Sequence, residues 1–192
     1  MLHNHDMKKE LLLGTAGWGK DIGKSDAFKM IEQFKSTGLD LIDSATNYPI
    51  NGVRKDFGVA ISWLGDWIRS VGTEESKIFV KIGSLDNSGK DHVDLSPKYI
   101  RETIWKLQEL LGKNLYGIGI HWDKRDNFED ILSTLLTMKE FQSYKYRLGI
   151  SGIEHPDLYN KTHEVDSDWL IQVKEYPGNN IARQNYSRYF PD

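Results

Sequence analysis

The chain has 192 residues, enough for one domain with a buried core. A formal net charge of −3 and a pI near 6.1 offer no basic face, so we expect neither nucleic acid nor an anionic membrane as a partner. The absence of cysteine excludes disulfides and thiolate metal sites, and no run approaches the roughly 20 apolar residues of a membrane span, so we predict a cytoplasmic protein.

Short apolar runs alternate with amphipathic stretches along the chain. The runs are "LLLG" from 11, "LDLID" from 39, "KIFVKIG" from 77, "LYGIGIH" from 115, "YRLGIS" from 146 and "WLIQVKEY" from 169. Strand-like runs that alternate with helix-like stretches indicate βαβ units and a parallel sheet. Periodicity alone leaves two folds open, an open doubly wound sheet and a (β/α)8 barrel.

Capping signals mark the helices between these runs. Ser96 caps "LSPKYIRETIWKLQELLG", which has a proline at its first helical position and ends at Gly112. Asp126, with Glu129 three residues later, predicts a capping box at the start of the next helix. Ser25 is expected to cap an earlier helix over residues 26–36.

Three consecutive apolar runs end in a polar residue that can take part in chemistry. Asp43 follows "LDLI", with Tyr48 five residues later; Lys81 follows "KIFV" and His121 follows "LYGIGI". The carboxyl ends of parallel strands share one edge, so we expect these four residues to converge. A buried charge needs a partner, and Lys81 is the expected partner of Asp43. A nearby ammonium makes a tyrosine a better proton donor and a histidine can orient a carbonyl, so the set suits polarisation of a C=O group while a nucleophile or a hydride arrives at its carbon.

The order and spacing of these residues resemble the aldo-keto reductase family along nearly the whole chain. The matching segments are "LLLGTAGWG", "LIDSATNYP", "FVKIG", "GIGIHWD", "RLGISG" and "WLIQVKEYP". The resemblance implies a (β/α)8 TIM barrel in which Tyr48 donates the proton, Lys81 and Asp43 tune it, and His121 positions the carbonyl. It also implies hydride from a nicotinamide cofactor, NADPH or else NADH, and a small carbonyl substrate, an aldehyde, ketone or sugar.

The resemblance also indicates where the cofactor binds. Ser151 and Gln172 match positions that hold the nicotinamide carboxamide, and Asp43 would approach the nicotinamide ribose. Gly152 stands where the family usually has an asparagine, which removes one amide-binding side chain. Trp18, after the first strand, and Trp122 are expected to line the substrate pocket. The residues assigned to the cofactor are Gly17, Trp18, Asp43, Ser151 and Gln172.

The chain is short for this fold, because a complete barrel takes about 250 residues. We therefore expect one domain over residues 1–192 with about six βα units, lacking the last two strands and the loops that in the family grip the cofactor phosphates. Six strands leave an open edge. A truncated chain, a homodimer that covers this edge and a rearranged smaller sheet are the resolutions that stay open.

Two further functions stay open beside carbonyl reduction. One is a truncated, non-catalytic member of the family that acts through a partner. The other is Schiff-base lyase chemistry at Lys81, since desolvated barrel lysines can serve as nucleophiles. We assign no metal site, and interpret the "HNHD" grouping of His3, His5 and Asp6 as fortuitous.

Overall fold

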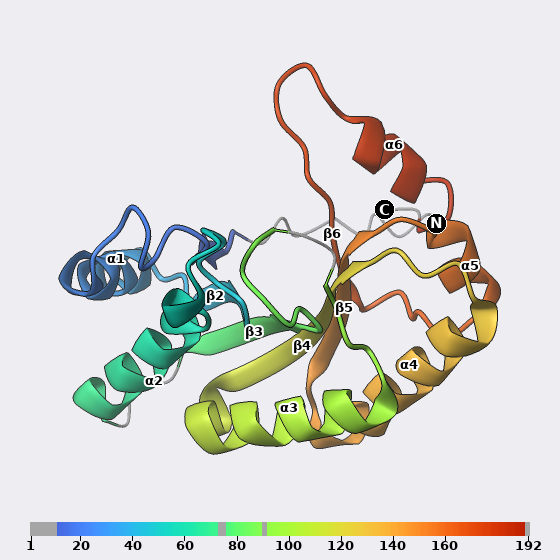
Figure 1. Ribbon diagram of the computed structural model, residues 1–192. Coiled ribbons are helices and arrows are strands. Elements are labelled where there is room, and N and C mark those ends of the chain that lie inside the picture. Colours follow the sequence, from blue (N-terminus) through green and yellow to red (C-terminus); the bar gives the residue numbers. More distant parts are fainter. Residues whose placement is uncertain (1–10, 73–75, 90–91, 191–192) are drawn as a thin grey trace, which may run out of the picture.

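The computed structural model describes residues 11–72, 76–89 and 92–190, in which strands and helices alternate (Figure 1). The "HNHD" grouping lies outside the described residues. The strands are β1 (Leu13–Gly14), β2 (Leu41–Ala45), β3 (Lys77–Ile82), β4 (Leu115–Asp123), β5 (Arg147–Ile153) and β6 (Leu170–Gln172). The helices are α1 (Lys24–Ser36), α2 (Val59–Val71), α3 (Pro97–Leu111), α4 (Phe128–Glu140), α5 (Pro156–Lys161) and α6 (Ile181–Tyr186). Short 3₁₀ turns lie at Arg54–Asp56, Gly112–Asn114 and Gln142–Tyr144.

The strands of the described chain form one parallel sheet in sequence order, from β1 to β6. The sheet curls, and helices α2 to α5 follow its outer side (Figure 1). A doubly wound sheet would reverse its strand order and carry helices on both faces. Sequential order with an outer layer of helices is the arrangement of a barrel. The predicted incomplete (β/α)8 barrel is therefore confirmed, as a curled half-barrel of six strands.

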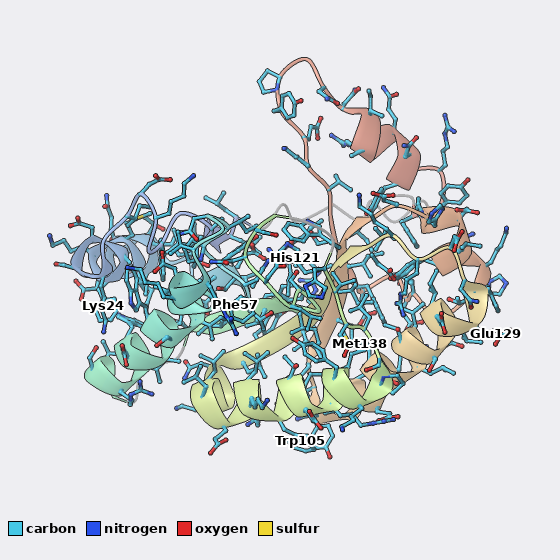
Figure 2. All side chains as sticks on the ribbon, viewed as in Figure 1. Lys24, Phe57, Trp105, His121, Glu129 and Met138 are labelled. Atoms are coloured by element: carbon cyan, nitrogen blue, oxygen red, sulfur yellow. The ribbon has the colours of Figure 1, made fainter. Side chains whose placement is uncertain are left out.

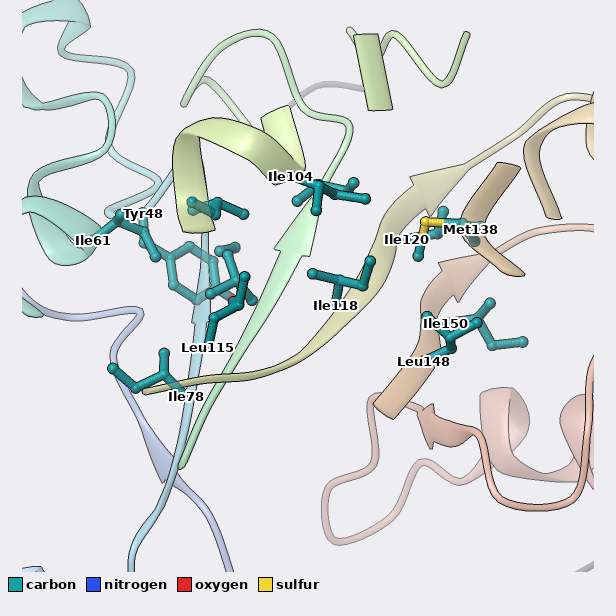
Figure 3. Packing of buried hydrophobic residues seen from close by; sticks show 14 of the residues in the cluster. Tyr48, Ile61, Ile78, Ile104, Leu115, Ile118, Ile120, Met138, Leu148 and Ile150 are labelled. Carbon is teal, nitrogen blue, oxygen red and sulfur yellow. The ribbon is translucent and has the colours of Figure 1, made fainter. Parts of the chain in front are cut away.

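Alternate residues of the central strands form the core between the sheet and the helices. Side chains in a strand alternate between two faces, so the aliphatic residues at every second position all point outwards. They meet Ile104 of α3 and Met138 of α4, both fully buried (Figure 3). The strand residues of this layer are Ile42, Ile78, Val80, Ile82, Ile118, Ile120, Leu148 and Ile150.

The other face of the same strands points into the curve and carries the residues predicted for chemistry. Lower in the curve, Phe79 lies over Gly117, Gly119 and Gly149, where an added Cβ would stand 2.7 to 2.8 Å from its ring. The glycines are thus required by the close approach of this aromatic side chain. Side chains in a strand return to the same face at every second residue. The next inward-facing residues after Phe79, Gly119 and Gly149 therefore lie two positions further along β3, β4 and β5. These are Lys81, His121 and Ser151.

The structure corrects two of the predicted helix starts. Ser96 caps α3 as predicted, with its hydroxyl accepting a 3.3 Å hydrogen bond from the N–H of the third residue after it. The cap of α4 is Asn127, not Asp126, and its side chain accepts a 3.0 Å bond in the same way. The predicted Ser25 cap is wrong, because the chain enters α1 in extended conformation at Gly23 and Ser25 is already helical. Among the described helices, none is long and apolar enough to cross a membrane.

The prediction that a strand ends at Asp43 is also wrong. Strand β2 continues to Ala45, so Asp43 is its middle residue. Lys81 and His121 likewise lie one and two residues before the ends of β3 and β4. A strand can carry these polar groups because they face the inside of the curve, while their neighbours in sequence fill the apolar layer.

Candidate active site

The structure brings the four predicted catalytic residues together at the carboxyl edge of the half-barrel. The ammonium nitrogen of Lys81 lies 2.5 Å from Oδ2 of Asp43 and 5.2 Å from the ring centroid of Tyr48. The His121 ring meets Tyr48 edge-on, with centroids 5.7 Å apart. Figure 2 shows His121 inside the curve of the sheet. The predicted pairing of Lys81 with Asp43 is confirmed.

The Lys81–Asp43 ion pair is nearly shielded from solvent. The side chain of Lys81 is 4% exposed and that of Asp43 16%. The second carboxylate oxygen accepts a 2.8 Å hydrogen bond from Nε2 of Gln172. Because Gln172 lies on β6, this bond crosses the inside of the curve and ties the last described strand to the second. The structure does not test Schiff-base chemistry at Lys81, which stays a prediction.

Burial dominates the proton affinities of Tyr48 and His121. Burial raises the pKa of Tyr48, the nearby Lys81 ammonium lowers it, and the Asp43 carboxylate raises it, with a net rise. The expected action of Lys81 is therefore present but smaller than the effect of burial. Burial and the Lys81 charge together lower the pKa of His121 to about 3, so its imidazole is neutral at physiological pH. Its Nδ1 lies 3.5 Å from the hydroxyl of Ser84.

Trp122 and Gly152 form one wall beside His121. The His121 ring stacks on the half-buried Trp122 indole at a centroid distance of 4.1 Å. Trp122 has φ 58° and Gly152 has φ 67°, both in the left-handed region. A Cβ at position 152 would lie 2.5 Å from Cδ1 of Trp122. The glycine that replaces the family's usual asparagine thus makes room for this indole.

The predicted cofactor residues fall into two groups. Ser151 lies on β5 directly beside His121 in the sheet, and Gln172 is bound to Asp43, so both adjoin the four catalytic candidates. Gly17 forms a turn in which its carbonyl accepts three backbone hydrogen bonds. Trp18 is fully buried in the core, and its indole nitrogen has no hydrogen-bond partner among the described residues. A cofactor role for Gly17 and Trp18 stays a prediction.

The sequence patterns do not reveal a buried network behind the site. The Asp123 carboxylate, with no exposed surface, is held by Arg125 at 2.7 and 2.9 Å and by the hydroxyl of Tyr159 at 2.6 Å. The network anchors the chain two residues beyond His121. The D-x-R spacing was a local signal for the ion pair, whereas Tyr159 joins through the fold. In the described part of the chain, no group of three or more His, Asp or Glu residues is placed to hold a metal ion.

Comparison with known proteins assigns this geometry to a family. The family model described as "Aldo/keto reductase family" matches residues 10–167. The chain belongs to this family. Two curated relatives, "Protein tas" of Escherichia coli strain K12 and of Shigella flexneri, are each 27% identical over 119 residues, or 59% of this chain and 34% of theirs. This aldo/keto reductase chain therefore spans about a third of the length of the curated relatives it matches.

Solved structures agree on the fold. A Pseudomonas aeruginosa protein assigned to the aldo-keto reductases superposes with a TM-score of 0.70 at 20% identity, over 95% of this chain and 70% of that one. The holo form of the aldo-keto reductase AKR11C1 from Bacillus halodurans gives a TM-score of 0.65 at 19% identity, over 86% of this chain and 53% of that one. At such identities the likeness shows the fold alone.

Proposed function

We propose that this chain carries the active site of an oxidoreductase that reduces the carbonyl of an aldehyde, ketone or sugar, with NADPH, or else NADH, as the reductant. The observation that carries the proposal is the convergence of Asp43, Tyr48, Lys81 and His121 inside the curve of the sheet. Membership of the aldo/keto reductase family supports the same chemistry.

Each of the four residues has a distinct role in this proposal. Neutral His121 donates a hydrogen bond to the substrate carbonyl and orients it without giving up its proton. Tyr48 transfers its hydroxyl proton to the oxygen that becomes an alcohol. Burial makes the resulting phenolate costly, so the Lys81 ammonium stabilises it, and Asp43 holds that ammonium in place.

The residues beside these four fit the nicotinamide end of the cofactor. The hydroxyl of Ser151 and the carbonyl oxygen of Gln172 have no hydrogen-bond partner within the described chain, and a carboxamide offers donors and an acceptor that match them. When bound, the nicotinamide supplies the hydride. The described sheet ends at β6, so the later loops that the resemblance assigns to the phosphates have no counterpart in it.

Substitution of Tyr48 by phenylalanine tests the proposal. NADPH oxidation is measured with a panel of aldehydes, ketones and sugars on the wild-type chain, on Tyr48→Phe and on Tyr99→Phe. Tyr99 lies on α3, where the groups that act on its hydroxyl are Thr103 and Asp94 and not the four catalytic candidates, and it loses the same hydroxyl, so it is the matched control. We expect kcat to fall by about 10²- to 10⁴-fold in Tyr48→Phe, the usual contribution of a general acid, and to change little in the control. Unchanged reduction by Tyr48→Phe would overturn the mechanism.

A second candidate is a non-catalytic family member that acts through a partner, including a second copy that covers the open edge. It is favoured by the Gln172 side chain, which already donates a hydrogen bond to the Asp43 carboxylate. Titration with NADPH and NADH separates the two candidates. Saturable micromolar binding that Asp43→Ala weakens supports the enzyme, whereas a folded chain that binds neither supports the second candidate. Sedimentation velocity tests the homodimer.

A further inference from the structure

A cavity of about 570 Å³ lies at the end of the half-barrel opposite to the catalytic candidates. It adjoins the first residues of β3 and β4, the end of α3 and the turn after α4. Lys77 in its wall begins β3, whereas Lys81 lies near the carboxyl end of the same strand. The volume falls within the range of small-molecule sites in proteins. None of the residues proposed for carbonyl reduction lines it.

Aromatic side chains form one wall of this cavity. Trp105 of α3 meets Phe141 at 5.8 Å and Tyr144 at 5.9 Å between ring centroids, and Tyr144 stacks on Tyr146 at 6.4 Å. Trp105 is 52% exposed and Tyr144 57%. Figure 2 shows Trp105 on the side of α3 that faces away from the sheet. Large aromatic surfaces left in contact with water in one place are typical of a binding surface.

Lysines give the same cavity a positive charge. Its charged lining residues are three lysines and one aspartate. Lys77 is partly neutralised by Asp40 at 3.2 Å, and its ammonium lies 5.9 Å from the Tyr116 ring centroid. Lys145 is exposed, sits between Tyr144 and Tyr146 in sequence, and forms no ion pair with any residue that the structure describes. An ammonium is thus available at the edge of the aromatic wall.

We propose that this cavity binds a small planar aromatic acid. The ring of the ligand packs against Trp105 and Tyr144, and its acidic group pairs with Lys145. An aliphatic acid would pair with the lysine charge but would lack the ring contacts. An aromatic cation would make the ring contacts but would be repelled by the lysines. The proposal therefore requires both properties in one ligand, and it is independent of carbonyl reduction at the other end of the sheet.

Calorimetric titration of the full chain with three probes tests this requirement. The probes are 2-naphthoate, cyclohexanecarboxylate and 2-naphthylmethylammonium, at pH 7 and at low and high salt. We expect 2-naphthoate to bind with a Kd on the order of 1 mM or lower, as a ligand of its size does, and the other two about tenfold more weakly. High salt should weaken the binding of 2-naphthoate.

Variants locate the binding. Trp105→Leu and Lys145→Gln should each raise the Kd of 2-naphthoate by about threefold or more. The matched controls are Tyr176→Leu and Lys174→Gln. Lys174 lies 5.8 Å from the ring centroid of Tyr176, which is 51% exposed, and neither residue lines the cavity. Both control variants should leave the Kd of 2-naphthoate unchanged. The proposal is overturned if the folded chain does not bind 2-naphthoate, if the cationic probe binds equally well, or if Trp105→Leu binds as the wild type does. In any of these cases the aromatic wall is packing between α3 and the turn after α4.

Discussion

Replacing Lys81 by methionine should destabilise the protein by about 3 kcal/mol, because it leaves the Asp43 carboxylate inside the curve without its counter-ion. Two unit charges 2.5 Å apart attract each other by about 7 kcal/mol at an effective dielectric constant of 20. Most of that attraction offsets the loss of hydration. Breaking such a pair costs about 3 to 5 kcal/mol, and we expect the lower end because Asp43 is 16% exposed and keeps its bond to Gln172.

A double-mutant cycle separates the ion pair from other effects of these substitutions. Asp43→Asn leaves the ammonium unpaired and should cost about as much as Lys81→Met, whereas the double variant removes both charges. The double variant should therefore be more stable than the sum of the single effects implies, by about 2 kcal/mol. Urea unfolding at pH 7, followed by circular dichroism and tryptophan fluorescence, gives the four free energies.

The exposed pair of Lys98 and Glu102, 3.9 Å apart on α3, is the control cycle, and we expect no measurable coupling there. A coupling between Lys81 and Asp43 below about 0.5 kcal/mol would refute the reasoning, since that is the ordinary error of additivity. It would mean that the two charges are not paired inside the folded chain.

Two further predictions concern the wall of the site. Burial lowers the pKa of His121 from 6.5 to about 3, so between these pH values the unfolded chain binds one more proton than the folded chain. The stability that depends on neutral His121 is therefore complete above pH 6.5 and is lost as the pH falls towards 3. Unfolding free energies measured from pH 7 to pH 4 should fall more steeply in the wild type than in His121→Gln, and parallel curves would contradict this. Gly152→Ala should cost about 1 to 3 kcal/mol in urea unfolding, because the new Cβ meets Trp122 at a positive φ. Gly14→Ala, where a Cβ meets nothing within 4 Å, is its control, and an equal cost for the two would refute the steric argument.

The sequence by itself determined the alternation of six strands with helices and the places of Asp43, Lys81 and His121 on three successive strands. These properties follow from local patterns, because hydrophobic periodicity and the order of residues along a strand are written in the chain. The cap of α3 belongs with them, since serine followed by proline is a strong local signal. The start of α4 was predicted one residue too early, because Asp126 and Asn127 offer the same capping chemistry and the backbone conformation decides between them.

The tertiary structure alone decided how the sheet curls and what meets across its curve. Gln172 reaches Asp43 from 129 residues away, and no local pattern contains that contact. The net rise in the pKa of Tyr48 and the large fall in that of His121 depend on how much of the molecule surrounds them, which sequence order does not state. The contact between Trp122 and Gly152 also exists only in the folded chain, because it forms where β4 and β5 lie side by side. Burial and long-range contact are properties of the folded chain, and they set the chemistry of residues that the sequence could identify.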